Sequence, residues 1–142
     1  MKHKLTRKNL EKLKACETGL KYFDENFTGD VETFTAQLAK DHPEHYLWLV
    51  GRNFDVPVDA DTIRECALKT RGSALVRCAD KLDADTLREC ALKSPWAALE
   101  FCPHLLDDKT IKRCAILCPR KALWYCKDRL DIAMIQQLEG MR

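Results

Sequence analysis

A repeat of 24 residues occupies the second half of this 142-residue chain. Residues 59–82 and 83–106 are identical at 14 of 24 positions, and residues 107–130 share nine positions with the copy before them. The copies follow one another without an insertion. A period of this length is typical of stacked units, because each unit buries its apolar face only against its neighbours. The repeat constrains the fold more than any other feature of the sequence.

Each copy has the pattern of two short helices. An aspartate opens every copy, at Asp59, Asp83 and Asp107, and aspartate is a favoured helix N-cap. Apolar residues follow at positions i, i+3 and i+4, which places them on one face of a helix. In two copies a proline suited to the first helical turn, Pro95 or Pro119, begins the second helix. Helices this short are marginal alone in water, so we expect them to stack.

The same template extends towards the N-terminus once a four-residue slip is allowed. We therefore predict an all-α fold, a short-helix repeat resembling an α-solenoid, with about four helical hairpins in a single domain over residues 1–142. The chain has only five glycines and five prolines, fewer than the many tight turns of a sheet-rich fold require. The expected parts are a capping helix (1–28, helical over 5–27), a divergent hairpin (29–58), three repeats (59–82, 83–106 and 107–130) and a terminal helix (131–142).

Six of the eight cysteines are spaced by 12 residues, half the repeat, and fall on the predicted buried faces: Cys66, Cys78, Cys90, Cys102, Cys114 and Cys126. The chain has no C-x-x-C pair, so the spacing of zinc fingers and iron–sulfur proteins is absent. A buried free cysteine behaves as a small hydrophobic residue, and we predict core packing for these six. Cys118 lies off this spacing, at the predicted start of a second helix. It is either a reactive thiol or an N-cap residue without further function.

Motifs of enzyme chemistry are missing: there is no G-x-S-x-G, no H-E-x-x-H and no glycine-rich phosphate loop. His42 and His45 flank Pro43 beside acidic residues, a pattern that suits either a metal ion or the start of a helix. We expect no metal there, because no third ligand is suggested nearby. The sequence predicts no enzyme and no cofactor. A metal- or thiol-dependent enzyme at His42 and His45, or at Cys118, is the third hypothesis.

Aromatic residues of the predicted second helices give the first functional hypothesis. On a helical wheel, Phe101, Trp124 and Tyr125 point away from the buried stripe, and Trp96 lies beside them. Exposed aromatic residues are the usual anchors of protein interfaces. The alternative is that neighbouring hairpins cover these rings. From this patch we predict a stoichiometric protein-binding inhibitor or adaptor.

Basic residues give the second hypothesis, a nucleic-acid-binding accessory protein. Arg64, Arg88 and Lys112 repeat every 24 residues on the predicted first helices, and residues 1–14 carry six lysines and arginines. Such spacing suits a phosphate backbone. Acidic residues beside the column favour the alternative of an ordinary solvated surface. The net charge of +2 points to no particular partner.

The sequence has no apolar run of the about 20 residues that a membrane helix needs. Its basic start also lacks the apolar stretch of a secretory signal. We therefore expect a cytoplasmic protein without a membrane partner. A homodimer through the terminal helix, over residues 132–138, is a further expectation.

Residues 14–54 include the pattern A-C-x-x-G-L-x-[WFY]-F, followed by a W-L pair. This segment resembles a short helical module of uncharacterised bacteriophage and bacterial mobile-element proteins, some of them described as immunity proteins. The resemblance implies a setting in a phage or its bacterial host, and no catalytic residue or cofactor. It also implies a bacterial defence complex as the target, in the manner of an anti-CRISPR or immunity protein. The matching residues are Cys16, Gly19, Leu20, Tyr22, Phe23, Trp48 and Leu49.

Overall fold

The computed structural model describes residues 2–141, which form eleven α-helices and three short 3-10 helices. One isolated bridge pairs His3 with Phe54, and no β-strand forms within these residues. The predicted all-α class is therefore confirmed. Residues 1 and 142, at the outer ends of the predicted first and last segments, lie outside the described part. Between residues 2 and 141, every helix is too short or too polar to cross a lipid bilayer.

The prediction of one helix over residues 5–27 is wrong, because two helices occupy this segment: α1 (Arg7–Lys12) and α2 (Glu17–Asn26). Lys14 separates them with a left-handed φ of 65°. Its N–H donates to the Glu11 carbonyl, and the N–H of Ala15 donates to the Leu10 carbonyl. These two bonds form a Schellman motif, which ends a helix by satisfying its last carbonyl groups.

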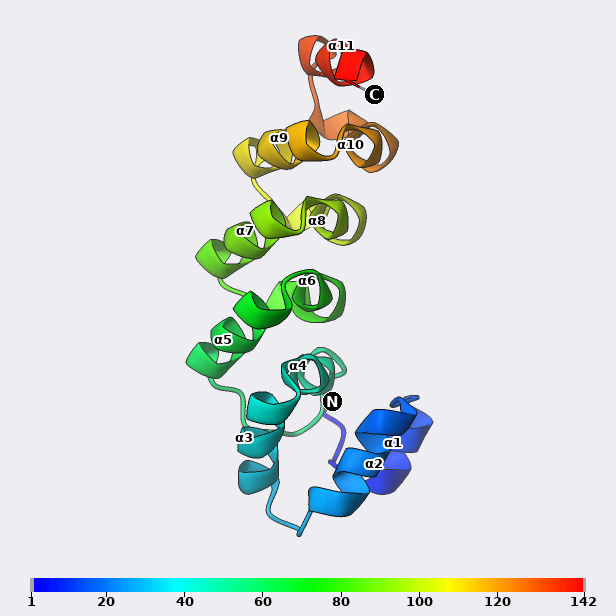
Figure 1. Ribbon diagram of the computed structural model, residues 1–142, viewed down its shortest axis with the longest axis vertical. Helices are drawn as coiled ribbons and strands as arrows, with labels where there is room; N and C mark the ends of the chain where they lie inside the picture. Colours follow the sequence, from blue (N-terminus) through cyan, green and yellow to red (C-terminus); the bar gives the residue numbers. More distant parts are fainter. Residues whose placement is uncertain (1, 142) are drawn as a thin grey trace.

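The chain then forms four helix pairs: α3 (Val31–Asp41) with α4 (Pro43–Gly51), α5 (Ala60–Thr70) with α6 (Gly72–Cys78), α7 (Ala84–Lys93) with α8 (Pro95–Phe101), and α9 (Asp108–Leu117) with α10 (Pro119–Tyr125). The last three pairs each end in a 3-10 turn: η1 (Ala79–Lys81), η2 (Pro103–Leu105) and η3 (Lys127–Arg129). Figure 1 shows the pairs one after another along the long axis. Helices α1 and α2 lie at one end, and α11 (Ile132–Met141) lies at the other.

The predicted aspartate caps are confirmed in all three copies of the repeat. Asp59, Asp83 and Asp107 accept hydrogen bonds from the backbone N–H groups of Thr62, Thr86 and Thr110 at 3.1, 2.7 and 2.7 Å. Each bond satisfies a donor that the first turn of a helix leaves without a partner. The predicted prolines also stand in the first turns of α8 and α10.

Small residues let neighbouring pairs approach closely. Helix α5 packs on α7 and α7 on α9, while α6 packs on α8 and α8 on α10. The side chains at these contacts include six alanines without exposed area: Ala67, Ala74, Ala91, Ala98, Ala115 and Ala122. Such short side chains allow backbones to come near one another without leaving voids.

The core packing predicted for the six regularly spaced cysteines is confirmed, since all six are buried and free. Four of them donate to a carbonyl oxygen of the preceding helix pair, at Sγ–O distances of 3.4–3.6 Å: Cys66 to Ala39, Cys90 to Ala67, Cys114 to Ala91 and Cys126 to Leu99. Burial raises the pKa of the Cys90 thiol to about 11 and that of Cys78 to about 12. These thiols are therefore structural groups and remain protonated at neutral pH.

Candidate functional site

All four aromatic residues singled out by the sequence are exposed. Trp124 on α10 is 81% exposed, and Trp96, Phe101 and Tyr125 are 41–48% exposed. Neighbouring helices therefore leave these rings open to solvent. Their role in binding stays a prediction, but the access that binding requires is present.

Tyr125 takes part in a polar contact that joins α10 to α8. The Tyr125 hydroxyl donates to Glu100 Oε1 at 2.7 Å, and Lys121 Nζ donates to the same oxygen at 3.2 Å. The Lys121 ammonium also lies 5.4 Å from the centre of the Tyr125 ring. The hydrogen bond to Glu100 raises the pKa of Tyr125 above its ordinary value. Phe101 and Trp124 are the chain neighbours of these bonded residues, so the contact fixes the backbone that carries both rings.

Trp124 also lines an open groove of about 490 Å³, together with Arg120, Leu123, Lys127 and Glu139. The groove lies where α10 and η3 meet α11, and its rim carries two cations and one anion. This groove is not predicted from the sequence. Glu139 reaches it only through the docking of α11 on α10, for which the periodic pattern holds no signal.

Trp96 does not share this groove. It lies at the start of α8, where its Cζ2 atom is 3.3 Å from the position that a Cβ atom on Gly72 would take. Within residues 2–141, no ring contact joins Trp96 to Phe101, Trp124 or Tyr125. The same holds among Phe101, Trp124 and Tyr125 in the described residues, so the structure exposes all four predicted residues without joining their rings into one cluster.

Acidic side chains engage two members of the predicted basic column. Arg64 donates to Thr86 Oγ1 at 2.7 Å and lies 3.5 Å from a Glu89 carboxylate oxygen. Arg88 pairs with Asp85 at 2.9 Å. Lys112 is exposed. Arg64 thus faces a carboxylate of the next repeat and Arg88 one of its own, so the column presents less positive charge than the sequence alone indicates.

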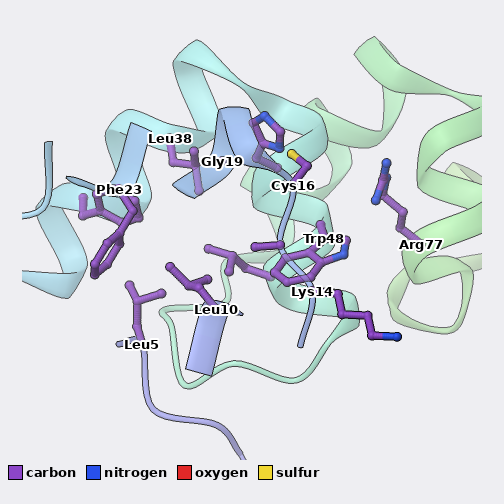
Figure 2. A pocket seen from close by; sticks show the side chains of 13 residues that line it. Leu5, Leu10, Lys14, Cys16, Gly19, Phe23, Leu38, Trp48 and Arg77 are labelled. Atoms are coloured by element: carbon purple, nitrogen blue, oxygen red, sulfur yellow. The ribbon is translucent and has the colours of Figure 1, made fainter. Parts of the chain in front are cut away.

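The residues of the N-terminal module build a separate pocket of about 190 Å³ between the capping helices and α4. Figure 2 shows apolar side chains such as Leu10, Phe23 and Trp48 around it, with Lys14 and Arg77 at its edge. A methyl group on Gly19 would meet Cys16 and His45 only at ordinary contact distances of 3.6 and 3.9 Å. This pocket lies at the junction between α1, α2 and the first helix pair.

Two further sequence candidates lie elsewhere. Cys118 is half-buried at the N-cap of α10, and its side chain makes no capping hydrogen bond. In the terminal helix, Leu138 is fully buried while Ile132 is 76% exposed. A homodimer through this helix would therefore have Ile132 as its apolar contact, because Leu138 is already used within the chain.

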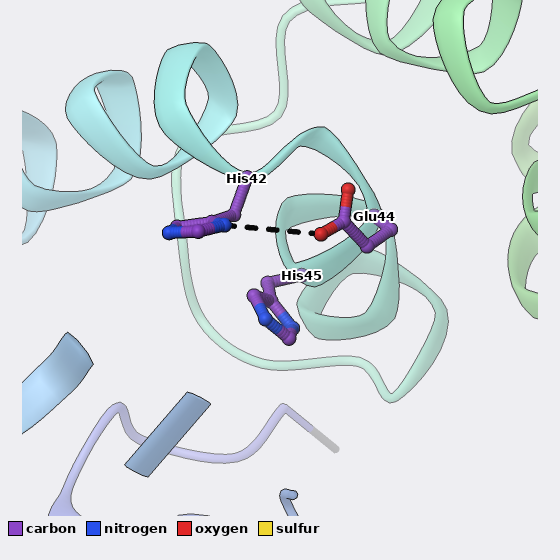
Figure 3. A group of neighbouring side chains, drawn as sticks. All are labelled: His42, Glu44 and His45. Carbon is purple, nitrogen blue, oxygen red and sulfur yellow. Dashed lines mark ion pairs between the residues drawn. The ribbon is translucent and has the colours of Figure 1, made fainter. Parts of the chain in front are cut away.

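His42, Glu44 and His45 place three possible metal ligands close together at the junction of α3 and α4 (Figure 3). From the sequence, the two histidines were the candidate ligands and no third ligand was expected. Glu44 joins them because the chain bends at His42, whose φ of −140° and ψ of 75° are not helical.

Comparisons of the chain with protein-family models, with curated proteins and with solved structures give no match. The resemblance of residues 14–54 to phage and mobile-element modules therefore stays a prediction drawn from the residues themselves. The exposed Trp124 and the groove that it lines are therefore the observations on which a proposed function rests.

Proposed function

We propose that this chain is a non-catalytic binding protein that holds a partner protein in the groove beside Trp124, away from Ile132 at the start of α11. The observation that carries the proposal is Trp124, which is 81% exposed and forms one wall of a groove. Binding is favoured when a partner covers the large apolar ring of an exposed tryptophan, because that ring is removed from water. Tryptophan, tyrosine and arginine are also the residues that most often dominate binding energy in interfaces.

The charges around the groove indicate the chemistry of the partner. Arg120 and Lys127 stand beside Trp124, with Glu139 as the acidic member of the groove. Complementary charge speeds association and fixes orientation, whereas the apolar anchor supplies most of the affinity. The partner we propose therefore offers an apolar side chain flanked by acidic residues.

The scaffold we propose is a short α-solenoid-like repeat, in which residues 59–130 act as a spacer between the two ends. The starts of α5, α7 and α9 at Ala60, Ala84 and Asp108 support this, since they recur at the period of the sequence repeat. A stack of this kind is stabilised through contacts between neighbouring units. Such a stack presents its outer helices at regular intervals.

The biological role that we propose is stoichiometric inhibition or adaptation of a bacterial defence complex in the cytoplasm, in the manner of an anti-CRISPR or immunity protein. Its support is the resemblance of residues 14–54 to phage and mobile-element modules. Nucleic-acid binding through Arg64, Arg88 and Lys112 is the competing proposal. The carboxylate partners of Arg64 and Arg88 argue against it.

Affinity capture from a bacterial lysate treated with nuclease tests the proposal. Wild-type protein is compared with Trp124→Ala and with Ile132→Ala, an exposed apolar control on α11. We expect one stoichiometric protein that wild type and Ile132→Ala retain and Trp124→Ala loses. Recovery that disappears on nuclease treatment, and that Lys112→Ala weakens, would instead support the nucleic-acid proposal.

A further inference from the structure

Three side chains at the start of α4 converge on one point in space. His42, Glu44 and His45 each offer one ligand atom, and these atoms all lie within 4.8 Å of one another. His42 Nδ1 is 3.8 Å from Glu44 Oε1, and the centres of the two imidazole rings are 5.2 Å apart. Figure 3 shows the three side chains facing a common space. We infer that they form a binding site for a divalent transition-metal ion such as Zn²⁺.

The bend between two helices creates this arrangement. His42 ends α3 and precedes Pro43, the first residue of α4. Because proline fixes the first turn and His42 stays outside the helix, the His42 side chain faces that turn, where Glu44 and His45 stand. In a continuous helix His42 and His45 would share a face, but Glu44, two residues after His42, would point away from it. The position of Glu44 as a third ligand is thus a product of the bend.

The donor set selects the class of metal. Two imidazole nitrogens and one carboxylate oxygen suit Zn²⁺ and related transition metals, whereas Ca²⁺ and Mg²⁺ prefer oxygen ligands alone. Ligands bound at zinc distances in a tetrahedral site lie about 3.3 Å from one another. The three ligand atoms, now within 4.8 Å of one another, have to approach by at most about 1.5 Å to reach that value. Three protein ligands leave a coordination position for water or for a group from a partner.

Neighbouring groups hold the site and leave it accessible. The Tyr22 ring packs edge-on against His42 at 5.1 Å, and its hydroxyl donates to Asp41 Oδ2 at 3.0 Å. Helix α2 therefore supports the His42 ring, as outer groups commonly support metal ligands. The side chains of His42 and Glu44 are each 40% exposed, so an ion can enter from solvent.

Exposed thiols are the rival zinc ligands in this protein. Cys16 is exposed and Cys118 is half-buried. The test therefore uses the Cys16→Ser/Cys118→Ser background. Cys16 is the N-cap residue of α2, where serine is a better cap, so this change preserves the helix.

Calorimetric titration of chelator-treated protein with ZnCl₂, in the absence of any partner, tests the inference independently of the proposed function. We expect one ion per chain, and at least about tenfold weaker binding for His42→Gln, Glu44→Gln and His45→Gln. His104→Gln, a change on η2, is the control and should bind as the background does. ZnCl₂ should also raise the melting temperature of the background and of His104→Gln, but not of His42→Gln.

Circular dichroism in chelator establishes that each variant is folded. Should His45→Gln unfold because its ring is half-buried, the more exposed His42 and Glu44 decide the outcome. Loss of zinc binding in the double-serine background would assign the metal to thiols and overturn the inference. Unchanged affinity in both His42→Gln and Glu44→Gln would do the same.

Discussion

At the end of α4, Gly51 lies directly against the backbone carbonyl of Arg77 in α6, and a Cβ atom at this position would overlap that carbonyl. Alanine normally stabilises a helix relative to glycine. Here the two helices would have to separate, and overpacking of this kind costs about 1–3 kcal/mol. We therefore expect Gly51→Ala to lower the free energy of unfolding by an amount in this range, measured by urea titration.

Gly140→Ala in α11 is the matched control, because no heavy atom lies within 4 Å of its Cβ position. It should unfold at the same urea concentration as wild type or a slightly higher one. Gly51→Ala with wild-type stability would contradict the close approach of α4 to α6.

The cysteines give a second prediction for single residues. The thiolate is the reactive form, and burial raises the pKa of Cys66, Cys102 and Cys114 to about 11. Alkylation of the native protein at pH about 8 should modify Cys16 first and Cys118 more slowly, while the six buried cysteines react only after denaturation. Mass spectrometry of the adducts checks this order. Native modification of Cys78 at the rate of Cys16 would contradict it.

For the helices as elements, the aspartate caps connect stability to pH. Hydrogen bonds from Thr62, Thr86 and Thr110 lower the pKa of Asp59, Asp83 and Asp107 below the ordinary value of 3.8. An acid whose pKa is lower in the folded state stabilises the fold above its unfolded pKa. That contribution is lost as the pH falls through the folded value.

We therefore expect the free energy of unfolding to decrease below about pH 4. Asparagine caps a helix about as well as aspartate but does not titrate. The triple Asp→Asn variant should lose less stability than wild type between pH 6 and pH 3, measured by urea unfolding at both values. An equal loss in the two proteins would show that these caps do not cause the acid sensitivity.

The elements also show how far the sequence alone could predict this structure. Asp83 and Pro95 act locally, through a cap and a fixed φ angle, so the helices that they begin could be placed from the sequence. The break at Lys14 could not be placed, because apolar spacing continues through Leu13 and neither glycine nor proline marks it. A lysine adopts the left-handed conformation there without a sequence signal.

Some features of the candidate sites could likewise be predicted from the sequence, and others could not. Exposure of Trp124 follows from the angle of its position on a helix, which a helical wheel gives. The groove beside it depends on where α11 docks, and the position of Glu44 depends on a bend between two helices. Both are contacts between elements, and one sequence carries little information about them.

In the whole molecule, the two candidate sites lie far apart along the chain of helix pairs. The Trp124 groove is at the α11 end, while the histidine cluster is at the junction of α3 and α4, near α1 and α2 (Figure 1). Changes at one site should therefore leave the other intact. With a net charge of only +2, the chain also lacks a general electrostatic reason to bind polyanions.

The most direct test of the central claim is the affinity of the captured partner for wild type, Trp124→Ala and Ile132→Ala, at low and at physiological salt. We expect Trp124→Ala to bind at least about 30-fold more weakly, as loss of an interface anchor worth about 2 kcal/mol requires. Ile132→Ala should match wild type, and added salt should weaken binding by less than about tenfold. Wild-type affinity in Trp124→Ala, or a loss of about a thousandfold or more with salt, would contradict an aromatic-anchored protein interface.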